Sequence, residues 1–303
     1  MSLPGSSAPL LARGDTVGVV APGFAVRPAP LHAGVRRLRR MGFRVVLGEH
    51  VLSRHGYLAG PDDARAADLR AMIADDEVSA IWFARGGYGT ARILDRIPWR
   101  TLKRRTKLFV GYSDLTALFC AAVRRAGQVC LHGPVVTELG KPGAFHLSSL
   151  RRLLNGESTA LRVRRRQVLV EGKARGRLLG GNLTVLAHLL GTRYAPDARG
   201  CILFLEEVGE EAYRIDRALT HLRMSGVFRD LAGVLVGRCS VPGPQRSFPP
   251  DRSLKELLAE FFTPLGVPVL TDLPAGHVPA KWTLPLGGMA EIDTAAGEVR
   301  FRP

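Results

Sequence analysis

Ser113 has the sequence context of a nucleophile. It lies in Gly111-Tyr-Ser-Asp-Leu115, directly after the apolar run 108–110 and before apolar residues that recur at helical spacing. The pattern predicts a strand, a sharp turn and a helix. The serine hydroxyl would then lie at a sheet edge, beside the free N–H groups of a first helical turn. This is the geometry of a nucleophile elbow, although Leu115 replaces the second glycine of the usual G-x-S-x-G pattern. The alternative is that Ser113 or Asp114 only caps the helix.

A cluster of glycines follows another predicted strand. The segment Arg85-Gly-Gly-Tyr-Gly89 comes directly after the apolar residues 79–84. Its spacing fits neither a Walker loop, because no G-K-[ST] follows, nor the G-x-G-x-x-G dinucleotide pattern. Two interpretations remain open. The cluster is a tight strand–helix turn, or it lets the backbone approach a ligand closely, with N–H groups facing a developing negative charge.

A serine nucleophile also needs a base and a group that orients the base. The apolar segment 201–205 ends in two consecutive acids, Glu206 and Glu207, either of which could orient a base. Of the eight histidines in the chain, His132 and His277 end predicted strands beside glycines. The residue pattern alone leaves both histidines open as the base and both glutamates open as its partner.

These candidates lie in a chain whose pattern predicts an α/β fold. Up to residue 150, short apolar strands alternate with helical segments, which is typical of a parallel sheet. Ligands bind to such sheets at the carboxyl ends of the strands, where Ser113, His132 and the glycine cluster are expected. Residues 151–170 are basic and are expected to form an irregular linker. Residues 171–303 mix strands and helices and are expected to form a second domain.

Composition indicates a globular protein. The chain has 303 residues, of which 46% are hydrophobic, enough for a sizeable core. It shows neither a secretory signal pattern nor an apolar run of membrane-spanning length. The four cysteines are scattered without a C-x-x-C pair, so the sequence supports neither a zinc ribbon nor a redox motif. A cytoplasmic location without membrane contact is therefore expected.

The charge of the chain is strongly positive. Lys and Arg number 43 against 27 Asp and Glu, which gives a formal net charge of +16. This balance raises the chance of nucleic acid or another anion as a partner. However, the basic residues are spread along the chain and are not interleaved with the aromatic residues of a single-strand platform. Nucleic acid is therefore not the expected partner, although a non-catalytic module that binds anions or nucleic acid stays open as the alternative to an enzyme.

Five motifs in order carry a family resemblance. They are RGGYG at 85–89, GYSDLTAL at 111–118, LLGGNLT at 178–184, LEEVGE with YRIDR within 205–217, and GH with PLG within 276–287. Together these motifs resemble the LD-carboxypeptidase family of serine peptidases. The match runs from the first predicted strand almost to the last residues of the chain.

The resemblance implies both a fold and a site. The first domain, residues 1–150, would be flavodoxin-like with a parallel sheet, and the smaller mixed α/β domain of residues 171–303 would complete the site. The catalytic residues implied are Ser113 as nucleophile, Glu206 as acid and His277 as base. The backbone N–H groups of Gly86 and Asp114 would form the oxyanion hole.

The resemblance also implies a substrate. It would be a murein tetrapeptide, cleaved between the L-centre of its diamino acid and the terminal D-Ala, in the course of cell-wall recycling. Neither a metal nor a cofactor is implied, and relatives are commonly homodimers. The continuation Val208-Gly-Glu210 is more similar to the murein enzymes than to the microcin-immunity branch. Action on a peptidyl-nucleotide, as in that branch, remains the alternative.

Overall fold

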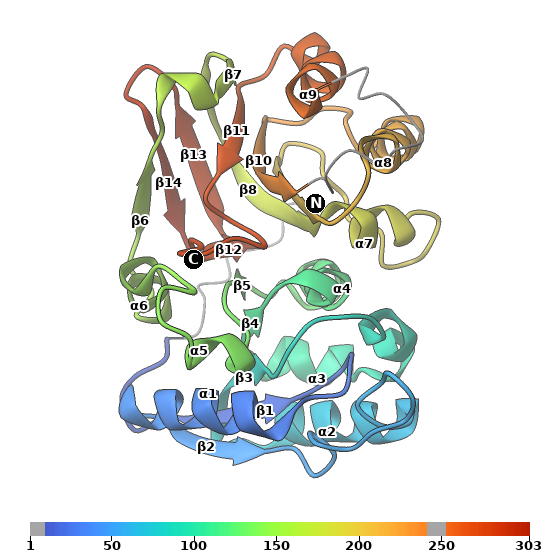
Figure 1. Ribbon diagram of the computed structural model, residues 1–303, viewed down its shortest axis with the longest axis vertical. Helices are drawn as coiled ribbons and strands as arrows, with labels where there is room; N and C mark the ends of the chain where they lie inside the picture. The colour runs from blue at the N-terminus through green and yellow to red at the C-terminus, as the bar shows by residue number, and fades with distance from the viewer. Residues whose placement is uncertain (1–9, 241–252) are drawn as a thin grey trace.

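Two β-sheets organise the protein (Figure 1). The computed structural model describes residues 10–240 and 253–303. In this part of the chain the first sheet has six strands in the order β12-β5-β4-β3-β1-β2, and the second has eight in the order β6-β14-β13-β8-β9-β10-β11-β7. The fold is thus α/β with a parallel-strand sheet and a second mixed sheet, as the sequence predicted.

The first sheet is parallel except at one edge. Its strands are β1 (Thr16–Val20), β2 (Arg44–Leu47), β3 (Val78–Phe83), β4 (Leu108–Gly111), β5 (Cys130–His132) and β12 (Leu284–Leu286). Strands β1 to β5 pair in parallel, whereas β12 pairs antiparallel with β5. Strands β1, β3, β4 and β5 are buried because helices cover both faces of the sheet, whereas the edge strand β2 is largely exposed.

Alternate residues of the central strand β3 show how the two faces are covered. Ala80 and Trp82 belong to one apolar cluster and Ile81 and Phe83 to another, because successive side chains point to opposite faces. The first face packs against α1 (Pro28–Arg40), α5 (Val136–Leu139) and α6 (Leu147–Leu154). The second packs against α2 (Asp62–Ala74), η1 (Thr90–Arg96), α3 (Trp99–Arg104) and α4 (Thr116–Ala126). In Figure 1, α5 and α6 lie to the left of β4 and β5, and α4 lies to their right.

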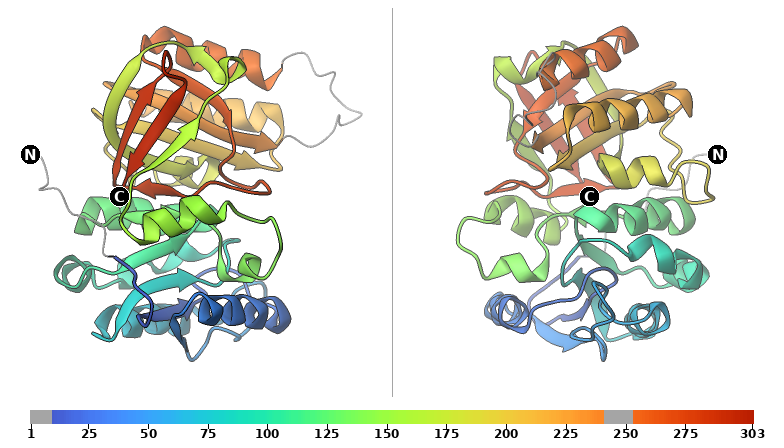
Figure 2. Two further views of the ribbon diagram at one scale, coloured as in Figure 1. Left: turned by 90° about the vertical axis from the view of Figure 1, so that its left-hand side faces the viewer. Right: turned by 45° about the vertical axis from the view of Figure 1, so that its right-hand side comes forward.

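The second sheet is mixed and curled (Figure 2). Its parallel centre consists of β8 (Lys173–Asn182), β9 (Ile202–Val208), β10 (Gly233–Ser240) and β11 (Val269–Leu273). Antiparallel strands extend it on both sides: β13 (Met289–Asp293), β14 (Glu298–Arg302), β6 (Thr159–Arg162) and β7 (Val168–Val170). The other elements of this half are η3 (Arg165–Gln167), α7 (Leu183–His188), α8 (Ala212–Met224), α9 (Leu254–Phe262) and η4 (Thr263–Leu265).

The segment 151–170 is not irregular, contrary to the expectation. It contains the end of α6 and the strands β6 and β7, which form the two edges of the second sheet. In β6, Thr159 and Leu161 are buried and Ala160 and Arg162 are exposed, an alternation that the surrounding arginines obscure in the sequence. Edge strands tolerate charged residues on their exposed side, so a basic segment can still pair. The proposed domain boundaries at 150 and 171 stay a prediction.

The two halves of the chain are closely joined. The C-terminal strand β12 belongs to the first sheet, where Leu284 pairs with His132. One buried apolar cluster contains both Phe119 of α4 and Leu178 of β8. Strand ends from both halves therefore meet, and residues far apart in the sequence can build one site there.

Candidate active site

Ser113 lies at the turn between β4 and α4. Strand β4 ends at Gly111, and the 3-10 helix η2 (Ser113–Leu115) begins at the serine. The φ angle of Ser113 is 71°, in the left-handed region that costs a non-glycine residue about 1–2 kcal/mol. A Cβ atom on Gly111 would lie 2.2 Å from Cδ1 of Leu115, so the leucine side chain packs over the bare glycine. The predicted strand, turn and helix are present, and Leu115 fits this turn in place of a second glycine.

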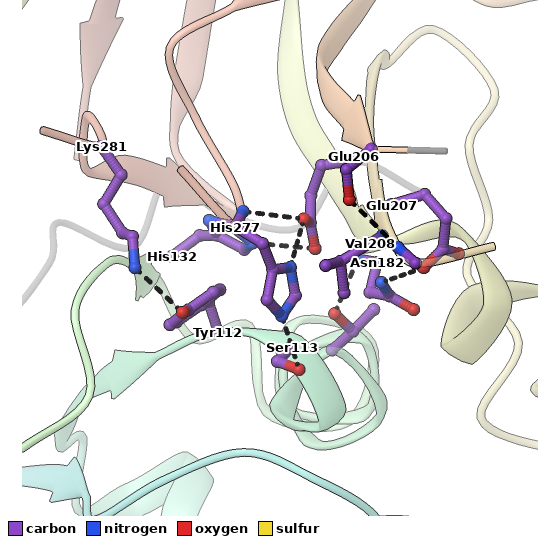
Figure 3. Close-up of polar contacts among 12 residues, drawn as sticks. Tyr112, Ser113, His132, Asn182, Glu206, Glu207, Val208, His277 and Lys281 are labelled. Carbon is purple, nitrogen blue, oxygen red and sulfur yellow. Dashed lines mark hydrogen bonds and ion pairs between the residues drawn. The ribbon is translucent and has the colours of Figure 1, made fainter. Parts of the chain in front are cut away.

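Three side chains from both halves of the chain form a continuous polar chain (Figure 3). Oγ of Ser113 lies 3.1 Å from Nε2 of His277, and Nδ1 of His277 lies 2.7 Å from Oε2 of Glu206. The same Oε2 accepts the backbone N–H of His277 at 3.2 Å. The side chain of Glu206 is fully buried, whereas that of His277 is 19% exposed. One ring nitrogen of His277 is thus held by a buried carboxylate, and the other faces the serine hydroxyl.

A glycine allows this close contact between histidine and glutamate. Gly276 precedes His277 with a φ of 97°, and a Cβ atom there would lie 2.4 Å from Oε2 of Glu206. A side chain at this position would therefore displace the carboxylate as well as strain the backbone.

His132, the other candidate base, lies behind the glutamate. Its Nε2 is 4.0 Å from Oε1 of Glu206, and its ring packs edge-on against Phe204 and Tyr112. The side chain is 1% exposed, and burial lowers the pKa of His132 to about 3. Within the described residues no hydrogen bond joins His132 to Ser113. The structure therefore brings His277, not His132, to the serine.

The backbone of Gly86 lies directly against the serine. A Cβ atom on Gly86 would be 2.8 Å from Cβ and 3.0 Å from Oγ of Ser113. On the other side, Asp114 follows the serine, and its buried carboxylate accepts the N–H of Thr90 at 2.8 Å and the Thr90 hydroxyl at 2.6 Å. Burial raises the pKa of Asp114. The Asp114 carboxylate thus ties the glycine cluster to the serine turn instead of capping α4.

A buried arginine fixes the loops around this edge of the sheet. The Arg65 side chain is fully buried, and its guanidinium donates to the carbonyl oxygens of Pro22, Gly60 and Gly89. These three carbonyls belong to separate loops, so one rigid planar cation holds all three in register.

Comparison with known proteins identifies the family. Residues 17–133 match the family model for the LD-carboxypeptidase N-terminal domain, and residues 175–292 match the model for the LD-carboxypeptidase C-terminal domain. A probable murein peptide carboxypeptidase from Bacillus subtilis is 38% identical over 293 residues, which cover 94% of this chain and 91% of that protein. The chain belongs to the LD-carboxypeptidase family. It is therefore a serine-type carboxypeptidase, and the resemblance that the five motifs suggested is confirmed.

Two solved structures have the same fold as this LD-carboxypeptidase. The muramoyltetrapeptide carboxypeptidase from Oxalobacter formigenes superimposes with a TM-score of 0.85 at 31% identity, covering 94% of this chain and 97% of the other. The microcin C7 self immunity protein MccF, solved in complex with aspartyl sulfamoyl adenosine, gives a TM-score of 0.89 at 22% identity over 99% of both chains. The second likeness shows the fold alone.

Glu207 of this LD-carboxypeptidase faces away from His277. One oxygen of Glu207 accepts the side-chain amide of Asn182 at 2.9 Å and the N–H of Val208 at 2.8 Å, and the other accepts the N–H of Thr184 at 2.9 Å. Both oxygens are thus used to hold the start of α7 against β9. Of the two consecutive acids, only Glu206 contacts a histidine.

Lys281, Tyr112 and Glu138 form a second polar group beside the site, which the sequence did not predict. Nζ of Lys281 donates to the Tyr112 hydroxyl at 2.9 Å and to Oε1 of Glu138 at 2.7 Å, and it lies 4.1 Å from the centre of the Tyr112 ring. Burial and the adjacent Glu138 carboxylate raise the pKa of Tyr112 far above its usual value. The Tyr112 ring packs on the His277 ring with centroids 4.7 Å apart. The only sequence signal was the tyrosine that directly precedes the serine.

The described residues of the LD-carboxypeptidase show neither a metal-binding cluster nor a membrane-spanning helix. Among residues 10–240 and 253–303, no group of three His, Cys, Asp or Glu side chains could hold a metal ion. In the same ranges, every helix is too short or too polar to cross a membrane.

Proposed function

We propose that this enzyme is a murein tetrapeptide carboxypeptidase that releases the terminal D-Ala, with Ser113 as nucleophile, His277 as base and Glu206 as its orienting acid. The observation that carries the proposal is the chain of contacts from Oγ of Ser113 through both nitrogens of His277 to Glu206, at 3.1 and 2.7 Å. Each contact is within the range of a working nucleophile–base–acid arrangement.

In the proposed mechanism each of the three groups has one role. The Glu206 carboxylate accepts from Nδ1–H of His277, so the lone pair of Nε2 faces the serine hydroxyl. Nε2 takes the hydroxyl proton while Oγ of Ser113 bonds to the carbonyl carbon of the scissile amide. Nε2 then donates this proton to the nitrogen of the departing D-Ala, and an ester to Ser113 remains. A water molecule, deprotonated by His277, then attacks the ester carbonyl carbon. His277 returns this proton to Oγ of Ser113 as the ester C–O bond breaks, and the product leaves with a new carboxylate.

The negative oxygen of the tetrahedral intermediate needs donors that are already in place. We assign this role to the backbone N–H groups of Gly86 and Asp114, which flank the serine. The closeness of Gly86 to Oγ of Ser113 and the fixed position of Asp114 through Thr90 support the assignment. Preorganised donors of this kind lower the barrier more than donors that must reorient. This chemistry uses only groups of the chain and needs neither metal nor cofactor.

The murein substrate is supported by the relatives of 31% and 38% identity, whose names refer to murein peptides. Free carboxylates on such a peptide also suit a protein with a net charge of +16. A peptidyl-nucleotide substrate is the alternative, but the likeness to MccF at 22% identity supports only the fold. We further propose that the enzyme is a homodimer and that it is cytoplasmic. A reducing compartment suits the free thiols of all four cysteines.

Release of D-Ala from a purified murein tetrapeptide tests the proposal. The wild-type enzyme should release D-Ala in the presence of a chelator. Ser113→Ala should lose on the order of a millionfold in kcat, yet its free energy of unfolding should match that of the wild type. Turnover of a peptidyl-nucleotide but not of the tetrapeptide would favour the alternative substrate. An active Ser113→Ala variant would contradict the mechanism. Salt-dependent binding of nucleic acid, unchanged in Ser113→Ala and without any turnover, would favour a binding module.

A further inference from the structure

His132 has no part in the proposed triad, yet it lies beside its buried acid. Nε2 of His132 faces Oε1 of Glu206 across 4.0 Å (Figure 3). Within residues 10–240 and 253–303, both atoms are buried without a hydrogen-bond partner. Native proteins leave few buried polar atoms unpaired, and each such atom calls for an explanation. Here two of them face each other.

The charges around the pair favour a neutral ring. His132 is 1% exposed and approaches Glu206 from β5, while His277 approaches the same carboxylate from the loop after β11. Lys281 and His277 disfavour a charged His132, and burial has the largest effect, so the pKa of His132 falls to about 3. The Tyr112 hydroxyl and the Cys239 thiol also lie near Glu206, and Glu207 follows it on β9. A neutral imidazole carries one N–H, and placing it on Nε2 would give Oε1 of Glu206 its missing donor.

We propose that His132 is a positioning residue for Glu206, donating from Nε2 to Oε1, so that two histidines hold the two oxygens of one catalytic carboxylate. The inference rests on the proposed function, because it matters only if Glu206 orients His277. The separation of 4.0 Å exceeds that of a hydrogen bond. Catalytic hydrogen bonds are often long in a free enzyme and tighten when the substrate binds.

The role follows from what the carboxylate must do. Glu206 has to stay ionised and keep its orientation while His277 becomes an imidazolium. A donor to Oε1 stabilises the ionised form, whereas a bare buried oxygen binds a proton more readily. Without His132, the Glu206–His277 pair should therefore take up its proton at higher pH, and His277 should be oriented less well.

Two substitutions separate hydrogen bonding from packing. His132→Gln keeps an N–H donor near the position of Nε2, whereas His132→Phe keeps the ring but has no donor. We expect His132→Gln to retain kcat within about threefold, and His132→Phe to lose about tenfold or more in kcat at nearly constant KM. The acid side of the pH profile should move up by about one pH unit in His132→Phe and remain unchanged in His132→Gln.

A measurement without substrate keeps this test independent of the proposed substrate. The proton between Nδ1 of His277 and Glu206 should give a far-downfield NMR signal that persists in His132→Gln and shifts or disappears in His132→Phe. Loss of this signal in His277→Ala assigns it. His132→Phe as active as the wild type with an unchanged signal, or more active than His132→Gln, would show that His132 only fills space. Equal and near-complete loss in both variants, matching His277→Ala, would instead make His132 itself the base. Either result overturns the proposal.

Discussion

Replacement of Gly86 by alanine tests how tightly the serine must be held. The φ angle of Gly86 lies outside the left-handed region, so alanine imposes no backbone strain there. The new methyl group would, however, lie 2.8 Å from Cβ and 3.0 Å from Oγ of Ser113. The effect of Gly86→Ala should therefore be steric and should fall on the nucleophile.

The size of the effect follows from these distances. Ordinary contact begins at 3.4 Å, so the two Cβ atoms must separate by about 0.6 Å. Ser113 is already strained at a φ of 71°, and it can yield only by changing its contact of 3.1 Å with His277. Because a misplacement of about 1 Å can cost about a hundredfold, Gly86→Ala should lower kcat by about ten- to a hundredfold, or about 1.4–2.7 kcal/mol in the barrier.

Steady-state release of D-Ala and urea unfolding measure the two consequences separately. Gly127→Ala is the matched control, since Gly127 ends α4 with a φ of 67° and open space around its Cβ position. The control Gly127→Ala should lose about 1 kcal/mol of stability without loss of kcat. Gly86→Ala should instead lose kcat and keep its free energy of unfolding. A folded Gly86→Ala enzyme with kcat within about twofold of the wild type would refute the argument from close approach.

Three further predictions concern buried groups near the site. Glu207→Gln should lower the free energy of unfolding by about 1–2 kcal/mol, because it weakens three hydrogen bonds at the start of α7, yet keep kcat within about threefold. Glu206→Gln should lower kcat by about 10⁴-fold, because the glutamine amide favours the wrong tautomer of His277. Urea unfolding and D-Ala release, measured on both variants, distinguish the two acids. If Glu207→Gln lost activity and Glu206→Gln lost only stability, the roles of the two acids would be exchanged. Protonation of His132 should favour unfolding as the pH falls below its unfolded pKa of 6.5, since the folded pKa is about 3. Stability should thus decrease by about 2 kcal/mol between pH 7 and pH 5 through this group alone. Urea unfolding at both pH values measures this decrease. In His132→Gln the decrease in stability should be smaller by this contribution of His132. An equal decrease in the variant and the wild type would contradict the prediction.

The order of strands and helices in the first half was predictable because each element carries its own signal. Apolar runs such as 108–110 are buried on both faces, and their composition alone marks them as central parallel strands. The serine turn was predictable for the same reason, because its strand, glycine and helix are adjacent in the sequence. The edge strands β6 and β7 were missed because pairing at a sheet edge needs little apolar surface.

The choice between the two glutamates shows what local sequence leaves open. Glu206 and Glu207 are neighbours on β9, so their side chains point to opposite faces. Which of them meets a histidine depends on the placement of β9 in the sheet. In the folded chain Glu206 lies on the face that meets His277, whereas Glu207 contacts Asn182 and the N–H of Thr184.

The base was likewise decided by tertiary structure. His132 ends β5 and His277 follows β11, each beside a glycine, and in sequence both are separated from Ser113 by other elements. Strand β12 pairs with β5 and so brings the loop that contains His277 over the serine, while His132 stays buried behind Glu206. The sequence by itself determined which residue types were available and the local turn that presents the serine. Only long-range pairing decided which of them meet, because contacts between residues 164 positions apart depend on the packing of the whole chain rather than on any local preference.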